Sequence, residues 1–127
     1  MRCYLPLSKS EFAHFIDSSQ MQCEILYVAT TTLALEYGVS DEEETEYAAL
    51  ELARTDAESI KKPVIVALEL SEVSMASGSE IKAGVVTGKY SIRNPDVVAL
   101  YLIYGDDDEL EWYDASESAI CLAKIGE

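Results

Sequence analysis

One segment constrains the fold more than any other, the run GVSDEEETEYAALELARTDAESIKK at residues 38–62. It begins with acidic residues, continues with alanine and leucine at helical spacing, and is followed by Pro63, which cannot continue a helix. Ser40 and Glu43 have the spacing of a capping box. The segment therefore predicts one long helix from Asp41 to about Lys61.

The two ends and one face of this segment agree with a helix. Acidic residues in the first turn, and Lys61 and Lys62 in the last, would interact favourably with the helix dipole. Small and apolar residues at helical spacing predict the buried face, and the alanines among them would let the helix lie close against a sheet. These inward positions are Ala49, Leu50, Ala53, Ala57 and Ile60.

Short apolar runs on both sides of the long helix predict strands, because they are rich in β-branched and aromatic residues. They lie at residues 2–7, 24–30, 63–70, 81–92 and 96–105, with a further short run at 110–114. The run at 81–92 is interrupted by Gly84 and Gly88, so it is either one weak strand or a pair of strands.

Three further segments predict shorter helices. Ser8 and Glu11 form a second capping box that opens a helix to about Ser18. Residues 31–38 predict one or two helical turns that end at Gly38, and residues 115–127 a terminal helix. The expected buried residues of the first and last helices are Phe12, Phe15 and Ile16, and Ile120, Cys121 and Ile125.

The order of these elements predicts the fold class. Strands and helices alternate in the first half of the chain, whereas several strands follow one another in the second half. We therefore expect an α/β (α+β) fold, a single-domain two-layer sandwich over residues 1–127 with a mixed sheet of five or six strands and about three helices.

Net charge restricts the class of partner. The chain of 127 residues carries 24 Asp and Glu against 9 Lys and Arg, a formal charge of −15. This charge disfavours direct binding to nucleic acid or to an anionic membrane, and it favours a basic protein as partner. Three cysteines without a CxxC pair, no signal-like start and a longest apolar run of only residues 97–104 predict a cytoplasmic protein. The oligomeric state is left open.

Two acidic clusters are the candidate binding residues. A helix start does not need as many carboxylates as the first cluster contains, and neighbouring carboxylates repel one another. The surplus predicts a partner-binding face, in which exposed aromatic side chains would anchor the partner. The candidate residues are Asp41, Glu42, Glu43, Glu44, Glu46 and Tyr47 in the first cluster, and Asp106, Asp107, Asp108 and Trp112 in the second. The alternative for each cluster is a solvated surface that binds nothing.

No catalytic residue, metal site or cofactor is predicted. Successive helical residues point about 100° apart, so the acidic run does not converge on a metal ion. The second cluster fails the EF-hand pattern because Leu110 occupies a ligand position. His14, the only histidine, has no recognisable nucleophile beside it, and the cysteines lie mostly in apolar segments.

Two stretches of the chain resemble a family of small acidic actinobacterial proteins with no assigned function. The first is the opening MRCYLP, and the second is YVATTTLALEYGVSDEEETEYAALELA at residues 27–53, whose acidic run ends E-Y-A-A. The resemblance covers about the first 70 residues and implies no chemistry. The matching segments are Met1 to Pro6, Thr31 to Tyr37, Asp41 to Ala49 and Val64 to Leu70.

A second, weaker resemblance concerns LYVATTTLALEYG at residues 26–38, a strand followed by a small helix. This pattern is similar to one in ADP-ribosyltransferase-like folds, and it would imply dinucleotide-binding roles for Arg2 and for Glu109 or Glu111. The function predicted from the residues is a non-enzymatic interaction module that binds a basic partner. The alternatives are a nucleotide-binding enzyme distantly like ADP-ribosyltransferases and a DNA-mimic inhibitor.

Overall fold

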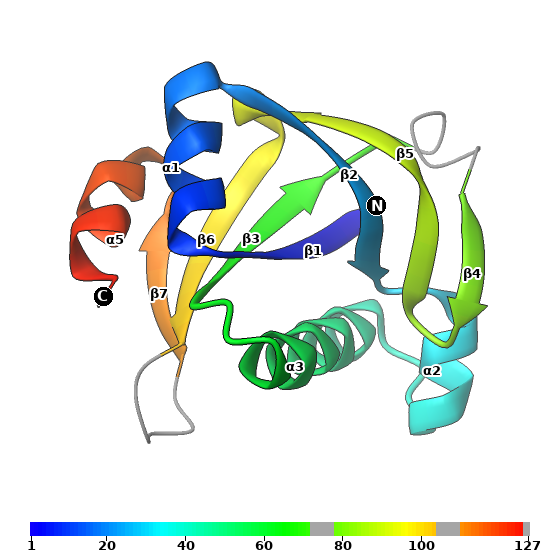
Figure 1. Cartoon of the computed structure of the whole chain (residues 1–127). Helices are drawn as coiled ribbons and strands as arrows, with labels where there is room; N and C mark the ends of the chain where they lie inside the picture. Colours follow the sequence, from blue (N-terminus) through cyan, green and yellow to red (C-terminus); the bar gives the residue numbers. More distant parts are fainter. Residues whose placement is uncertain (72–77, 104–109, 126–127) are drawn as a thin grey trace.

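A computed structural model of the chain describes residues 1–71, 78–103 and 110–125, and Figure 1 shows how its elements are arranged. In chain order these elements are β1 (Arg2–Leu7), α1 (Lys9–Ser18), β2 (Gln20–Val28), α2 (Thr31–Tyr37), α3 (Glu42–Ser59), β3 (Val64–Glu69), β4 (Ser79–Lys82), β5 (Val85–Arg93), β6 (Val97–Ile103), β7 (Leu110–Asp114) and α5 (Ser118–Lys124), with short 3₁₀ helices at Asn94–Asp96 and Ala115–Glu117.

The strands form one open sheet of seven strands in the order β4-β5-β2-β1-β3-β6-β7, and every pairing in it is antiparallel. The α+β class is confirmed. The prediction of a mixed sheet with five or six strands is wrong in both strand direction and strand number. A helix that connects two strands does not by itself make them parallel. The segment 81–92 contributes two strands, since the chain reverses at Gly84, whose φ of 80° suits a residue without a side chain.

Helices cover both faces of the sheet, so the predicted two-layer arrangement is also wrong. The side chains of β1 alternate between the faces: Cys3, Leu5 and Leu7 enter one core with α1 and α5, whereas Tyr4 enters a second core with α2 and α3. Figure 1 shows α3 on one side of β1, with α1 and α5 beside each other elsewhere on the sheet. Both cores therefore depend on the alternation along one central strand.

The long helix α3 is held close to the sheet by small residues. Ala49, Ala53 and Ala57 are completely buried in the second core, which also contains Ala67 and Ala99 of the sheet. Small side chains on both surfaces allow a close approach between helix and strands. The predicted face of α3 is confirmed except at its end, where Ile60 follows the last helical residue and is exposed.

The ends of α3 differ from the prediction. Its N-cap is Asp41 and not Ser40, because the Asp41 carboxylate accepts a hydrogen bond from the Glu43 amide at 3.0 Å. The helix ends at Ser59, and the φ of 59° at Lys61 shows that the chain has already left the helical conformation there. The two lysines therefore lie beyond the last turn.

The shorter helices follow the sequence more closely. The capping box of α1 is confirmed: Ser8 Oγ accepts from the Glu11 amide at 3.1 Å, and Glu11 accepts from the Ser8 amide at 2.8 Å. Gly38 ends α2 in the left-handed conformation, as expected. Cys121 of α5 and Ile125, directly after it, are buried as predicted, but Ile120 is exposed, because it points about 100° away from its neighbour Cys121 around the helix.

The alanine contacts of α3 predict a strong effect of side-chain size. Replacing Ala53 by Leu should lower the free energy of unfolding by about 1–3 kcal/mol, since Ala53 is completely buried in the second core and a larger side chain would overpack it. Thr55→Leu, on the exposed face of the same helix, is the matched control and should change the free energy by about 0.5 kcal/mol or less. Urea unfolding measures both; equal effects would contradict close packing at Ala53.

Candidate functional site

The first candidate site is a hollow between the end of α2 and the start of α3, here called the acidic hollow. Its volume is about 580 Å³. It is lined by Tyr37, Val39, Asp41, Glu43, Glu44, Tyr47 and Ala48. Tyr37 is 51% exposed and Tyr47 is 64% exposed, which is high for aromatic side chains. The hollow thus combines two accessible tyrosines with three carboxylates.

The turn between the two helices creates this hollow. Gly38 adopts a φ of 68°, and the Val39 amide donates to the Ala34 carbonyl at 3.0 Å, which closes the end of α2. Asp41 then caps α3, and Thr45 Oγ1 donates back to the Asp41 carbonyl at 2.8 Å. The tight turn therefore places the last residues of α2 beside the first turn of α3.

The start of α2 is attached to the β4–β5 hairpin through one carboxylate. Thr30 Oγ1 donates to Glu80 at 2.5 Å, the Gly84 amide donates to the same oxygen at 2.8 Å, and Thr30 also caps the helix at Leu33. Although burial alone would raise it, these hydrogen bonds lower the pKa of Glu80 below its usual value. Glu80 therefore stays charged and fixes α2 on the sheet.

The far half of α3 is attached to β2 by a second contact. The Tyr27 hydroxyl donates to the Asp56 carboxylate at 2.6 Å. Burial, together with the neighbouring carboxylate, raises the pKa of Tyr27, so the hydroxyl keeps its proton and remains a donor. With both helices anchored, the acidic hollow lies between two fixed elements.

The structure brings together four of the predicted site residues, Asp41, Glu43, Glu44 and Tyr47. Glu42 and Glu46 belong to the same helix but do not line the hollow. Glu46 instead contributes to the electrostatic environment of Arg2, Tyr4 and Tyr101 on the second-core face of the sheet.

Of the second predicted cluster, the structure describes only Trp112. Trp112 is exposed on the edge strand β7, opposite Tyr101 in the register, and does not line the hollow. Asp106, Asp107 and Asp108 lie outside the described residues.

Sequence reasoning missed Tyr37 and Val39. Both lie outside the acidic run: Tyr37 directly precedes Gly38, and Val39 directly follows it. The available signal was the glycine itself, because a helix that ends in a left-handed residue commonly reverses onto the next helix. That reversal places Tyr37 near residues of α3 that follow it by several positions in the sequence.

A cationic group is what this arrangement can bind. No lysine or arginine lines the hollow, so its carboxylates have no basic neighbour among its lining residues. A tyrosine ring attracts a cation that lies over its face, and carboxylates attract it by charge and by hydrogen bonding. Both interactions favour a lysine or arginine side chain over a neutral or anionic one.

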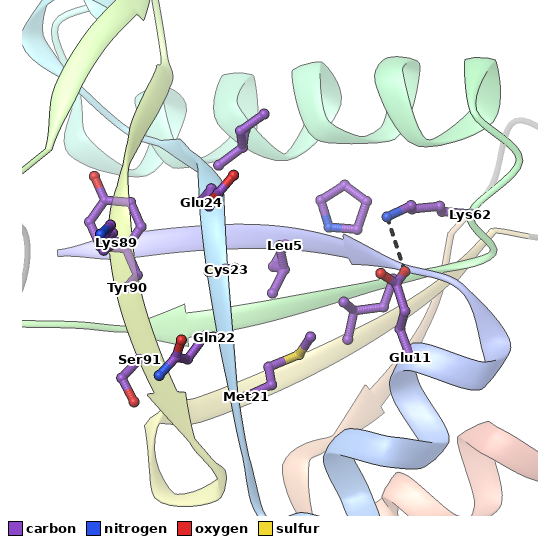
Figure 2. Close-up of a pocket in the computed structure, with 13 residues that line it drawn as sticks. Leu5, Glu11, Met21, Gln22, Cys23, Glu24, Lys62, Lys89, Tyr90 and Ser91 are labelled. Carbon is purple, nitrogen blue, oxygen red and sulfur yellow. Dashed lines mark ion pairs between the residues drawn. The ribbon is translucent and has the colours of Figure 1, made fainter.

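A second hollow, missed entirely from the sequence, lies where β1 and β2 separate, and it is here called the split groove. Its volume is about 660 Å³. Figure 2 shows β2 crossing β1 at a steep angle, with Leu5, Met21 and Lys62 among the side chains around the opening. The lining residues are Leu5, Pro6, Leu7, Glu11, Met21, Gln22, Cys23, Glu24, Ile25, Lys62, Lys89, Tyr90 and Ser91.

Pro6 accounts for the separation of the two strands. β1 pairs with β3 as far as Leu7, but its pairing with β2 stops at Tyr4, opposite Tyr27. The Met1 carbonyl accepts from the Leu70 amide at 3.0 Å, so the backbone groups of Met1 point to the β3 side. Successive residues of an antiparallel strand point their backbone groups to alternate sides, so those of Tyr4 and Pro6 point towards β2. Pro6 has no amide hydrogen to continue that ladder.

An ion pair closes one end of the split groove. Lys62 Nζ lies 3.0 Å from Glu11 Oε1, and Figure 2 shows the two side chains meeting across the gap between α1 and the start of β3. Partial burial would raise the pKa of Glu11, but the Ser8 amide and the Lys62 ammonium outweigh it and lower the pKa below its usual value. One carboxylate thus caps α1 and joins it to the segment that follows α3.

The cysteine thiols have the character of core residues. Burial raises the pKa of Cys3 to about 12 and the pKa of Cys23 and Cys121 to about 11. At neutral pH these thiols keep their protons, which makes them poor nucleophiles. Among the described residues, no three His, Cys, Asp or Glu side chains are placed to hold a metal ion.

Of the residues named for a dinucleotide role, Arg2 and Glu111 lie at opposite ends of the sheet's central strands. Arg2 pairs with Glu69 at 3.0 Å at the start of β1. Glu111 aligns through Leu102 and Val64 with Leu7, at the other end of β1, and its side chain contacts Tyr113. Glu109 lies outside the described residues.

The fold and site define an acidic α+β protein with an open antiparallel sheet, a tyrosine-lined acidic hollow and a split between two central strands. Residues 1–104 match a family of unknown function (DUF6912), and the chain belongs to this family. Neither curated proteins nor solved structures provide a match. In the part of the chain described by the structure, no helix is long and apolar enough to cross a membrane.

The Glu11–Lys62 ion pair predicts a pH-dependent contribution to stability. Gln at position 11 can still accept the Ser8 amide but carries no charge, so Glu11→Gln should cost about 0.2–1 kcal/mol at pH 7, the range of solvent-screened pairs. Because the pKa of Glu11 is lowered on folding, the contribution is present above the unfolded pKa near 4.3 and is lost as the pH falls through the folded pKa.

Urea unfolding of the wild type and Glu11→Gln between pH 3 and pH 7 measures this difference. Lys62→Gln removes the other partner of the ion pair. If the pair accounts for the effect, the double variant should lose the same free energy of unfolding as either single variant, within experimental error. A difference that stays constant across the pH range, or fully additive single changes, would show that the ion pair contributes nothing.

Proposed function

We propose that this protein is a non-enzymatic interaction module that binds a basic segment of a partner protein in the acidic hollow. The observation that carries the proposal is the lining itself: Tyr37 and Tyr47 are both accessible and share one hollow with three carboxylates and no cation. Exposed aromatic side chains cost free energy in water unless a partner covers them, and such residues dominate binding at protein interfaces.

The recognised group is a lysine or arginine side chain. It would enter between the tyrosine rings and the carboxylates of the first turn of α3, where cation–π and charge-assisted interactions act together. The formal charge of −15 would in addition increase the rate at which a basic partner arrives.

The other predicted functions receive no such support. A nucleotide-binding enzyme would need convergent polar groups, but Arg2 lies at the start of β1, whereas Glu111 of β7 aligns with the other end of β1. A DNA-mimic inhibitor would need both acidic clusters on one surface, and the second cluster includes Asp106 to Asp108, outside the described residues. Both alternatives stay predictions from the sequence.

Binding should depend on the charge and aromatic groups of the hollow. The triple variant Asp41→Asn, Glu43→Gln and Glu44→Gln keeps an N-cap side chain but removes three charges, and it should bind a basic partner about tenfold more weakly. Tyr47→Ala should weaken binding about threefold to tenfold through the lost cation–π contact. Affinity capture from lysate at low and moderate ionic strength, followed by titration calorimetry with the captured protein, measures both.

The matched control removes three charges elsewhere. The variant Asp17→Asn, Glu58→Gln and Glu111→Gln changes exposed positions that line neither the acidic hollow nor the split groove. A partner that is lost with the hollow variants, kept with the control variant and released by salt would support the proposal. Equal loss with both triple variants would reduce the effect to net charge, and no loss with either would place the binding surface elsewhere.

A further inference from the structure

We propose that the split groove binds an extended peptide segment of another protein, which pairs with the open edge of β2. This site is distinct from the acidic hollow: its lining residues come from β1, β2, β5, the start of α1 and the segment before β3, and none of them lines the hollow. The observations that support it are the open backbone edge, the room in the groove and the apolar side chains beside that edge.

The backbone of β2 has groups that face the groove, and no strand among the described residues lies opposite them there. The Ser19 carbonyl accepts from the Asn94 amide at 2.9 Å, so the backbone groups of Ser19 point towards β5. By alternation the backbone groups of Met21 and Cys23 also point towards β5, whereas those of Gln22 point to the opposite side. β1 would occupy that side if the sheet continued, but its pairing with β2 includes only Cys3 and Tyr4.

A register shift extends the open edge. Between Cys23 and Ile25 the pairing with β5 shifts by one residue, and Glu24 and Ile25 are both exposed in succession. After the shift, the Val28 amide donates to the Gly84 carbonyl on the β5 side. By alternation the backbone groups of Ile25 therefore point towards β1. Continuing the register of Tyr4 with Tyr27 would oppose Ile25 to Pro6, which has no amide to offer.

A peptide backbone is the chemistry that fits such an edge. Unpaired donors and acceptors that alternate along a strand are a template for another strand, and adding one is a known mode of peptide recognition. One residue of a strand occupies roughly 160 Å³, from a rise of about 3.3 Å, a strand spacing of about 4.8 Å and a layer depth of about 10 Å. The groove volume of about 660 Å³ therefore has room for about four residues.

The side chains beside the edge favour alternating apolar residues in that peptide. Leu5 and Leu7 belong to the first core, and Met21 and Cys23 pack against it, so they present apolar atoms on one side of the groove. A strand inserted here would direct every second side chain towards these residues and the others away from them.

The experiment selects a phage-displayed library of random seven-residue peptides on the Asp41→Asn, Glu43→Gln, Glu44→Gln variant, so that basic peptides are not enriched by the acidic hollow. The best peptide is then resynthesised in two forms, each with alternate backbone nitrogens methylated. Only one set of amides can face β2, so one form should bind at least about tenfold more weakly and the other should bind nearly as well as the parent peptide.

Two variants test the protein side. Gln22→Pro removes an amide that points away from β5 towards the groove, so it should weaken peptide binding at least about tenfold, whereas Gln22→Ala should change it less than about twofold. Amide chemical shifts on peptide addition should change at Met21 to Ile25. If no peptide is enriched, if both methylated forms bind alike, or if the shifts map elsewhere, the proposal is overturned. Because selection omits the acidic charges, either result leaves the proposed function to its own test.

Discussion

The pairing of β1 is the constraint on which the rest of the structure depends. This strand pairs with β3 along its whole length and joins β2 to the sheet through only two residues. Its alternating side chains supply both hydrophobic cores, one with α1 and α5 and the other with α2 and α3. A shift of one residue in this strand would exchange the two sets of side chains between the faces, so its register is strongly specified.

The shortened pairing with β2 has consequences at both hollows. At its paired end, Tyr27 lies opposite Tyr4 and anchors α3 through Asp56, which helps to hold the helix that forms one wall of the acidic hollow. Beyond this pair, β2 diverges from β1 at Pro6, and the split groove lies between the two strands. The paired part of β2 thus helps to fix the acidic hollow, and its unpaired part creates the split groove.

Local signals in the sequence predict much of this structure, and pairing partners account for what they miss. The capping box at Ser8, the stop at Gly38 and the alanine face of α3 depend on neighbouring residues, and each is found as predicted. Strand direction and the split at Pro6 depend on which strands lie side by side, a property that no local pattern encodes. For the candidate site, the acidic run predicted the carboxylates and Tyr47. Tyr37 was missed because it belongs to a different helix, brought close by a turn.

The charge surplus and the acidic hollow have different physical effects, and the distinction decides how selective the proposed function can be. A formal charge of −15 spread over the chain attracts any cation, and this attraction weakens with salt and carries little geometric information. The tyrosine rings act only at contact, over the few ångströms in which a cation lies against a ring face. Selectivity for one basic segment must therefore come from Tyr37 and Tyr47 and from the carboxylates held beside them by the capped start of α3. In the proposed function the overall charge would bring a basic partner to the surface, and the hollow would determine which of its side chains stays bound.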